Sequence, residues 1–357
     1  MAIFVPVSGF LGAGKTTTLL AAARELRARG HRPAIVTNDQ GCDLVDTRLA
    51  RTLTDAVGEV LDGCFCCRFG DLAEVTTTLV EAGADVVLAE AVGSCTDLRA
   101  TVVRPLRAYH GDTLTVAPLT TVVDPVRYRA FARAWAAGLD DDAAYLYAHQ
   151  LAEADVLALN KVDLVGADVP ALVSDLTRRN PSALVIPYSA RSGSVTALLD
   201  RWLAGGAEDR PDEELDYDRY AAAEAALAWL NQEVAVTGPL APGRWARVAL
   251  ASLSRAAAGT LVGHAKVSVE TEAGMAKGSV TSGGAAPTLD LPGPPTAANA
   301  RAVFNLRVAW PPATLDAACA EAVRAADAAC GTTSTTVGAP AAFQPSYPKP
   351  VHRLTRD

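Results

Sequence analysis

The sequence lacks the usual features of a membrane, secreted or nucleic-acid-binding protein. No uninterrupted apolar run reaches the roughly 18 residues of a membrane-spanning helix, although half of the residues are apolar. The apolar start, residues 1–7, has neither the basic beginning nor the small-residue cleavage site of a signal peptide. We therefore predict a buried first strand and a cytoplasmic protein without membrane contact.

The net charge and the cysteine content further limit the kind of protein that this sequence can encode. The formal net charge is -8, and the lysines and arginines are scattered, so no nucleic-acid partner is expected. Seven cysteines in 357 residues do not indicate a disulfide scaffold. Three of them, Cys64, Cys66 and Cys67, lie too close together in sequence for ordinary structural pairing. In a reducing cytoplasm such a cluster more often binds metal or does redox work.

The first part of the chain alternates short β-branched runs with helical patterns. Strands that are apolar on both faces and separated by helices imply a mainly parallel sheet covered on both sides. We predict a doubly wound α/β domain over residues 1–208. Its strands are expected at residues 3–7, 34–38, 86–89, 119–123, 156–160 and 184–187, and its helices at 16–29, 72–81, 143–151 and 169–179.

A smaller α+β domain is predicted over residues 209–357. The boundary is placed there because residues 205–218 are acidic and rich in turn formers. Residues 282–299, rich in Gly, Pro and Ala, are expected to form a long surface loop, and the residues after 329 a Pro- and Thr-rich tail. The expected helices are 220–234, 244–257 and 313–329, and the expected strands are 260–271, 276–281 and 302–310.

Residues 9–16 read Gly-Phe-Leu-Gly-Ala-Gly-Lys-Thr and fit G-x-x-x-x-G-K-[ST] between an expected strand and an expected helix. Glycines let backbone N–H groups turn toward phosphates, and the helix adds its positive N-terminal end. Lys15 should reach the β- and γ-phosphates, and the Thr16 hydroxyl should coordinate Mg²⁺. A Gly-rich turn without a ligand is the alternative. The predicted nucleotide contacts here are Gly12, Ala13, Gly14, Lys15, Thr16 and Thr17.

A second motif is expected to recognise the base of the nucleotide. The strand at residues 157–159 delivers Asn160-Lys161-Val162-Asp163 to its carboxyl end, where open α/β sheets bind ligands. This resembles the N-K-x-D motif of GTPases, in which the Asp carboxylate accepts two N–H bonds from guanine. Ser189-Ala190 resembles the companion S-A element that contacts the guanine oxygen. The order of these motifs favours GTP and GDP, although a helix cap could produce N-K-x-D by chance.

Two acidic residues follow strands whose ends are expected beside the phosphate loop. Asp39 and Glu90 are therefore predicted partners of Mg²⁺ and water, and with Lys15 they form the predicted catalytic group. Each could instead cap a helix or remain solvated in a loop. No arginine finger or catalytic glutamine is identified, apart from the nearby Gln40, so slow intrinsic GTP hydrolysis is expected.

Taken in order, the phosphate loop, the run Gly63-Cys64-Phe65-Cys66-Cys67, Glu90 followed by Gly93, and Asn160 to Asp163 resemble the CobW-type metallochaperone GTPases, in a divergent subgroup. The resemblance covers about residues 1–205. It implies GTP-dependent delivery of a divalent metal, zinc or cobalt, to a client metalloprotein or a cobalamin-pathway enzyme. Thiolates suit Zn²⁺ and Co²⁺, so Cys64, Cys66 and Cys67 can share one ion. Inert buried cysteines or a redox pair are the alternatives.

The chain departs from the family pattern at two cysteines. Cys95 lies in residues 90–97, Glu-Ala-Val-Gly-Ser-Cys-Thr-Asp, where the family has an E-x-S-G-x-A-x-P-like stretch, and Cys42 follows Asp39 closely. Each could approach the metal or simply pack. Related switch GTPases often dimerise across the nucleotide face, which leaves a homodimer open. Two other functions compete: a GTP-dependent regulatory switch with structural cysteines, and a small-metabolite kinase, which N-K-x-D disfavours.

Overall fold

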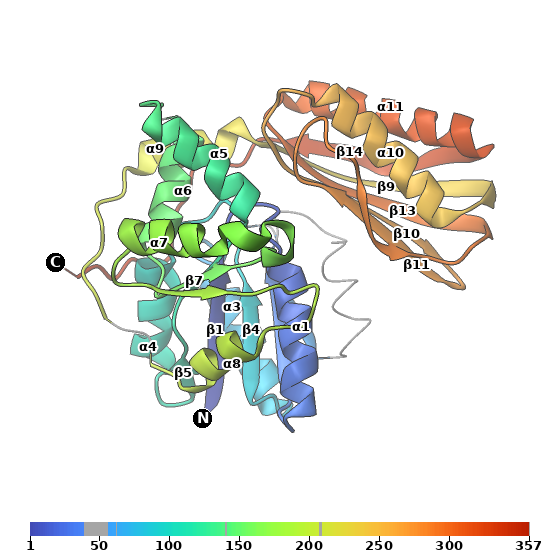
Figure 1. Ribbon diagram of the computed structural model, residues 1–357. Helices are drawn as coiled ribbons and strands as arrows, with labels where there is room; N and C mark the ends of the chain where they lie inside the picture. The colour runs from blue at the N-terminus through green and yellow to red at the C-terminus, as the bar shows by residue number, and fades with distance from the viewer. Residues whose placement is uncertain (39–55, 62, 140, 207–208, 357) are drawn as a thin grey trace. The chain divides into compact units, whose positions relative to one another are not determined.

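The computed structural model describes residues 1–38, 56–61, 63–139, 141–206 and 209–356. The chain forms two units, passing from the first to the second between Ala223 and Glu224 and returning to the first at Pro348 (Figure 1). This division differs from the boundary expected after residue 208. The acidic connector belongs to the first unit because Arg104 pairs there with Asp209 and Asp212. The residues from 348 onward also belong to the first unit instead of the C-terminal domain.

The first unit contains the predicted parallel sheet, with strand order β3-β2-β4-β1-β6-β7-β8 and β5 beside β1. Every strand pair in it is parallel, so the carboxyl ends of the strands lie along one edge. Val5 and Leu88 are completely buried, as expected for strands covered on both faces. The strands are β1 (Ala2–Ser8), β2 (Pro33–Asn38), β3 (Val57–Val60), β4 (Val86–Glu90), β5 (Leu114–Val116), β6 (Thr120–Val123), β7 (Val156–Leu159) and β8 (Leu184–Pro187).

Helices cover both faces of this sheet, which confirms the doubly wound class (Figure 1). Capping side chains and prolines determine where several of these helices begin. Asp124, for example, caps α5 by accepting the N–H groups of Val126 and Arg127, and Pro125 occupies the first turn. The helices are α1 (Lys15–Ala28), α3 (Phe69–Glu81), η1 (Arg99–Val103), α4 (Arg104–His110), α5 (Pro125–Ala136), α6 (Asp142–Ala152), η2 (Val162–Leu164), η3 (Gly166–Asp168), α7 (Val169–Arg179), α8 (Thr196–Leu203) and α9 (Tyr217–Ala226).

The second unit is an antiparallel sheet with strand order β12-β11-β10-β13-β9-β14. Two helices, α10 (Pro242–Ala256) and α11 (Pro312–Cys330), pack against one another and on the sheet (Figure 1). This confirms the predicted α+β class. The strands are β9 (Ala228–Leu240), β10 (Val262–Thr271), β11 (Gly274–Val280), β12 (Thr288–Pro292), β13 (Ala297–Val308) and β14 (Thr333–Phe343).

Three sequence-based predictions for this unit are wrong. The helix expected at 220–234 ends at Ala226, and β9 begins at Ala228 because its backbone pairs with two neighbouring strands, β13 and β14. The loop expected at 282–299 contains β12 and the start of β13. The Thr-rich tail contains β14, which pairs along β9. In each case a distant partner strand, absent from local patterning, decides the structure.

None of the helices in the described part of the chain combines the length and the apolarity needed to span a bilayer.

Candidate functional site

The phosphate loop joins β1 to α1 and has a backbone that only glycine adopts easily. Gly9 has φ 135° and Gly14 has φ 97°. A Cβ atom on Gly9 would lie 2.4 Å from the Val122 carbonyl oxygen, and one on Gly14 would lie 2.5 Å from the Asn160 amide nitrogen. Both conformation and close approach therefore require glycine. The loop ends at the α1 N-terminus, whose backbone N–H groups suit an anion.

Three predicted residues meet at the start of α1. The Lys15 ammonium donates to the Gly9 carbonyl at 2.9 Å and lies 3.9 Å from the Glu90 carboxylate. The Thr16 hydroxyl donates to Glu90 at 2.8 Å. Glu90 ends β4, opposite Val7 of the neighbouring β1, and this register brings it to the loop. The predicted Asp39, like Gln40 and Cys42, lies outside the described residues.

The segment after β4 lies directly against the phosphate loop at Gly93. A Cβ atom there would lie 2.9 Å from both the Lys15 Nζ atom and the Leu11 amide nitrogen. The buried Gln150 side chain fixes this segment by donating to the carbonyls of Gly93 at 3.1 Å and Cys95 at 2.8 Å. Sequence reasoning missed Gln150, because nothing local distinguishes it from other helical glutamines.

The predicted guanine motif lies beside the phosphate loop. The Asn160 side chain donates to the Ala13 carbonyl at 3.0 Å and accepts the Ala190 N–H at 3.0 Å. Lys161 donates to the Gly12 carbonyl at 2.8 Å. Asp163 is exposed. The motif thus ties the phosphate loop to the S-A element and leaves one carboxylate facing solvent.

Further polar contacts hold Lys161 and Ser189 in place beside the phosphate loop. Lys161 lies 2.5 Å from Asp124, which sequence reasoning did not select. Burial would raise the pKa of the Asp124 carboxyl, but the Lys161 cation and the hydrogen bonds that Asp124 accepts outweigh burial and lower it. Ser189 is buried, and its N–H donates to the Ser194 hydroxyl at 3.1 Å. Thr17, the other predicted contact, is exposed on α1.

The cysteine cluster occupies the turn before α3. Asn38, at the end of β2, holds this turn by donating to the Gly63 carbonyl at 2.7 Å and accepting the Phe65 N–H at 2.9 Å. Since β2 pairs with β4, with Thr37 opposite Glu90, the turn begins at the same sheet edge as the phosphate site. The phosphate loop and the cysteine turn, which α1, β2 and β3 separate in sequence, therefore lie at the same edge of the sheet.

The three sulfur atoms form a compact triangle. Cys64 lies 2.9 Å from Cys66 and 3.3 Å from Cys67, and Cys66 lies 3.8 Å from Cys67. All three are free thiols, because a disulfide needs about 2.05 Å. Tetrahedral Zn–S bonds of about 2.3 Å place sulfurs about 3.8 Å apart. The triangle therefore fits one thiophilic ion after a small expansion.

The same contacts favour ionisation of Cys64 and oppose ionisation of the other two thiols. Hydrogen bonds from Cys66, then Cys67 and Cys95, lower the pKa of the Cys64 thiol well below its usual value. Hydrogen bonding to Cys64 and burial raise the pKa of Cys66 well above it. The first negative charge thus falls on Cys64, and the other thiols stabilise it. Cys95, 1% exposed, is the further buried thiol that lowers the Cys64 pKa.

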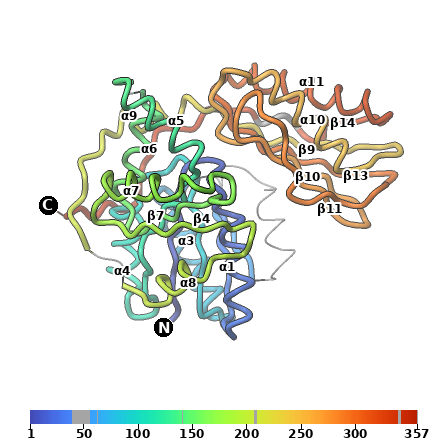
Figure 2. The backbone as a smooth tube through the Cα atoms, in the orientation of Figure 1, coloured from blue at the N-terminus to red at the C-terminus, as the bar shows by residue number. Residues whose placement is uncertain are grey.

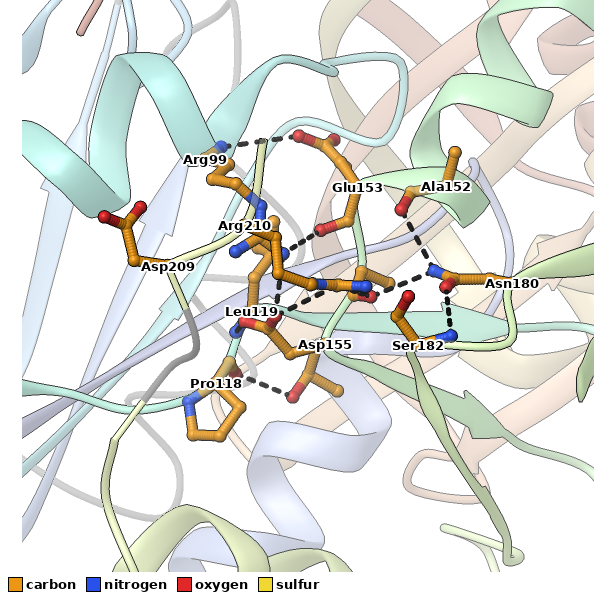
Figure 3. A network of polar contacts seen from close by, with 12 residues as sticks. Arg99, Pro118, Leu119, Ala152, Glu153, Asp155, Asn180, Ser182, Asp209 and Arg210 are labelled. Atoms are coloured by element: carbon orange, nitrogen blue, oxygen red, sulfur yellow. Dashed lines mark hydrogen bonds and ion pairs between the residues drawn. The ribbon is translucent and has the colours of Figure 1, made fainter. Parts of the chain in front are cut away.

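A polar network lies beside a cavity of about 280 Å³ (Figure 3). The Arg99 guanidinium donates to the Asp155 carboxylate at 2.7 Å and to the Glu153 carbonyl at 2.6 Å, and Arg210 donates to Asp155 at 3.0 Å. Burial and the neighbouring Asp97 raise the pKa of the Glu153 carboxyl to about 8, although it accepts hydrogen bonds from the Thr96 hydroxyl and the Arg99 N–H. No sequence motif predicted this network.

Residues 3–187 match the family model described as CobW/HypB/UreG, nucleotide-binding domain. The chain belongs to the CobW/HypB/UreG family. This confirms the resemblance drawn from the motifs, and with it a P-loop GTPase fold of metallochaperone type. The phosphate loop, the cysteine cluster and the guanine motif all lie within the matched residues.

The individual relatives share between 16% and 29% sequence identity with this chain. A zinc chaperone CobW from Sinorhizobium sp is 29% identical over 233 residues, which are 57% of this chain and 62% of that protein. The chain thus spans less than two thirds of this curated relative. Zn(II)-bound YjiA GTPase from E. coli is 18% identical, with 90% of this chain and 98% of that chain covered and a TM-score of 0.39. HypB from Helicobacter pylori in complex with nickel is 16% identical, with 59% and 92% covered and a TM-score of 0.43.

Proposed function

We propose that this chain binds and hydrolyses GTP and uses the cycle to deliver a divalent metal ion, Zn²⁺ or Co²⁺, to a client. The client is a metalloprotein or a cobalamin-pathway enzyme. The observation that carries the proposal is the sulfur triangle of Cys64, Cys66 and Cys67. The turn that carries these cysteines begins at the same sheet edge as the phosphate loop, so a bound nucleotide could influence the sulfur triangle.

The nucleotide roles follow from the contacts. Lys15 would exchange its bond to the Gly9 carbonyl for the β- and γ-phosphate oxygens, while the loop N–H groups hold the phosphates. Thr16 and Glu90, already joined, present hydroxyl and carboxylate oxygens of the kind that Mg²⁺ prefers, and Asp39 is their proposed companion. Bound Mg²⁺ would neutralise charge on the phosphates. Glu90 would orient the attacking water.

Guanine recognition is assigned to the exposed Asp163. Its two carboxylate oxygens can accept two neighbouring N–H groups of guanine, a donor pair that adenine lacks. Asn160 and Lys161 would act mainly by holding the phosphate loop, as their bonds to Ala13 and Gly12 indicate. We propose that Ser189 and Ala190, whose N–H groups donate to Ser194 and Asn160, form the wall beside the guanine oxygen.

For the cargo ion we propose Cys64, Cys66 and Cys67 as three ligands. Cys95 is our candidate for the fourth, because it is buried and helps to lower the pKa of the Cys64 thiol. Gln150 holds both Gly93 and Cys95, and Gly93 passes so close to the Lys15 ammonium that an added Cβ atom would lie 2.9 Å from it. A change in the γ-phosphate at Lys15 would therefore move the segment that carries the fourth thiol.

Metal titration of the full chain tests this proposal. Cys66→Ser with Cys67→Ser should weaken Zn²⁺ and Co²⁺ binding by at least about 100-fold, and Co²⁺ should lose its thiolate charge-transfer absorption. Cys330→Ser, at a half-buried thiol of the second unit, is the matched control and should bind as the parent does. Unchanged affinity in the double variant would instead favour a regulatory switch with structural cysteines.

Nucleotide competition tests the other half of the proposal. GTP and GDP should displace a fluorescent guanine nucleotide, and ATP should not. Strong ATP preference would remove the guanine assignment. Sizing the protein with GDP and with a non-hydrolysable GTP analogue tests whether the chain forms the homodimer that the family resemblance leaves open.

A further inference from the structure

The segment Pro348–Arg356, which we call the return segment, lies on the cysteine cluster. Its Lys349 N–H donates to the Cys67 sulfur at 3.3 Å, and its Val351 N–H donates to the Cys66 carbonyl at 2.9 Å. Pro348 and Pro350 have no N–H and favour extended backbone, so these two amides are the donors available there. Its Leu354 carbonyl accepts from Arg104, which places the end of the segment beside α4 of the first unit (Figure 2).

Further contacts hold the return segment along its length. The His352 ring packs against Phe69 and Tyr109, with ring centroids 5.1 Å and 5.0 Å apart. The Leu354 N–H donates to the Ala100 carbonyl at 2.9 Å, and its carbonyl accepts from Arg104 at 2.8 Å. The segment itself forms no helix or strand. It can therefore lift without unfolding a regular element.

One ion pair joins the return segment to the loop that follows β4. The Arg353 guanidinium donates to the Asp97 carboxylate at 2.8 Å. Asp97 also accepts the Tyr217 hydroxyl at 2.6 Å, and it adopts a left-handed conformation with φ 61°, which is unusual for a residue other than glycine. Asp97 comes two residues after Cys95 and four after Gly93, so it lies on the segment that passes close to Lys15 at Gly93.

We propose that the return segment is a cover over the cysteine cluster, latched by Arg353 and Asp97, and that it limits how fast the metal ion enters and leaves. Cys67 is the most exposed of the three sulfur donors and is the natural point of attack for an incoming client ligand. Lys349 blocks that approach and donates to the sulfur, as outer-shell N–H groups do to metal-bound thiolates. Movement of the loop at Asp97 would release the cover. The metal part of this inference rests on the proposed function.

Two rate measurements on the full chain test the cover. In metal-free protein, alkylation of Cys67 by iodoacetamide, followed by peptide mass spectrometry, should be about five- to tenfold faster in Arg353→Ala, because one partly exposed ion pair is lost. In zinc-loaded protein, capture of Zn²⁺ by excess chromogenic chelator should accelerate by a similar factor. The equilibrium affinity should change less than either rate. Arg353→Lys should restore part of the protection.

Arg324→Ala, which removes an exposed ion pair on α11, is the matched control and should match the parent in both rates. A second variant ending at Tyr347 removes the whole cover and should react faster still. Rates in both Arg353→Ala and the shortened chain equal to those of the parent would overturn the proposal. If no form binds Zn²⁺, the proposed metal function fails, and the alkylation rates still decide whether the segment covers the thiols.

Discussion

The Thr16 hydroxyl and the Glu90 carboxylate share a 2.8 Å hydrogen bond although 74 residues separate them. The bond joins the first turn of α1 to the end of β4. It places a hydroxyl and a carboxylate at the point where the phosphate loop would hold the terminal phosphate. The nucleotide half of the proposed cycle therefore depends on this pair.

Replacing Glu90 with Gln should separate binding from hydrolysis. The amide oxygen can still accept the Thr16 hydrogen bond, but the negative charge and the basic oxygen are lost. We expect single-turnover GTP hydrolysis to fall by about 10²- to 10³-fold, with GDP affinity changed only a few-fold. Glu25→Gln, at a half-buried glutamate of α1 that pairs with Arg29, is the control. Unchanged hydrolysis in Glu90→Gln would remove Glu90 from the proposed catalytic group.

Gly93→Ala should disrupt the contact between the loop after β4 and the phosphate loop. The added methyl group would lie 2.9 Å from the Lys15 Nζ atom and from the Leu11 amide nitrogen, closer than real Cβ atoms come. We expect weaker binding of a non-hydrolysable GTP analogue, measured by calorimetry. Gly70→Ala is the control, because a Cβ atom there meets nothing within 4 Å. Equal affinity in both variants would show that this contact does not influence the nucleotide.

Asp163→Asn should specifically impair guanine binding. One of the two acceptors becomes a donor, so a guanine N–H loses its partner and faces another N–H. We expect GTP and GDP affinity to fall by about 10- to 100-fold, measured by displacement of a fluorescent nucleotide. Asp168→Asn, at an exposed aspartate paired with Arg129, should leave the affinity unchanged. A loss in the control equal to that in Asp163→Asn would argue against a specific base contact.

Glu153 should make the protein less stable at alkaline pH. Its pKa is raised to about 8 in the folded chain, against about 4.3 for an unfolded glutamate. Between these values the folded state binds the extra proton, so this contribution to the unfolding free energy declines as pH rises from about 4 to 8. Glu153→Gln removes that decline.

Thermal unfolding of the metal-free protein at pH 5 and pH 9 measures the effect. The midpoint of Glu153→Gln should exceed that of the parent more at pH 9 than at pH 5. Glu321→Gln, an exposed glutamate of α11, should show no such difference between the two pH values. A constant offset for Glu153→Gln at both pH values would mean that the Glu153 pKa is not raised.

The local motifs were predictable because each is a contiguous stretch with its own geometric demand. The positive φ angles of Gly9 and Gly14 belong to the phosphate loop itself, and Asn160 to Asp163 follow directly from a buried strand. By contrast, β9 carries a sequence that also suits a helix, and only its pairing with β13 and β14 makes it a strand.

The sequence by itself determined the parallel α/β class, the phosphate loop and a thiolate cluster, because strand periodicity, glycine conformation and cysteine spacing act over a few residues. Only the tertiary structure decided which unpredicted distant groups meet them: Gln150 on Gly93 and Cys95, and the return segment on Cys67. Such contacts depend on sheet order and on chain paths between elements. No local pattern encodes them.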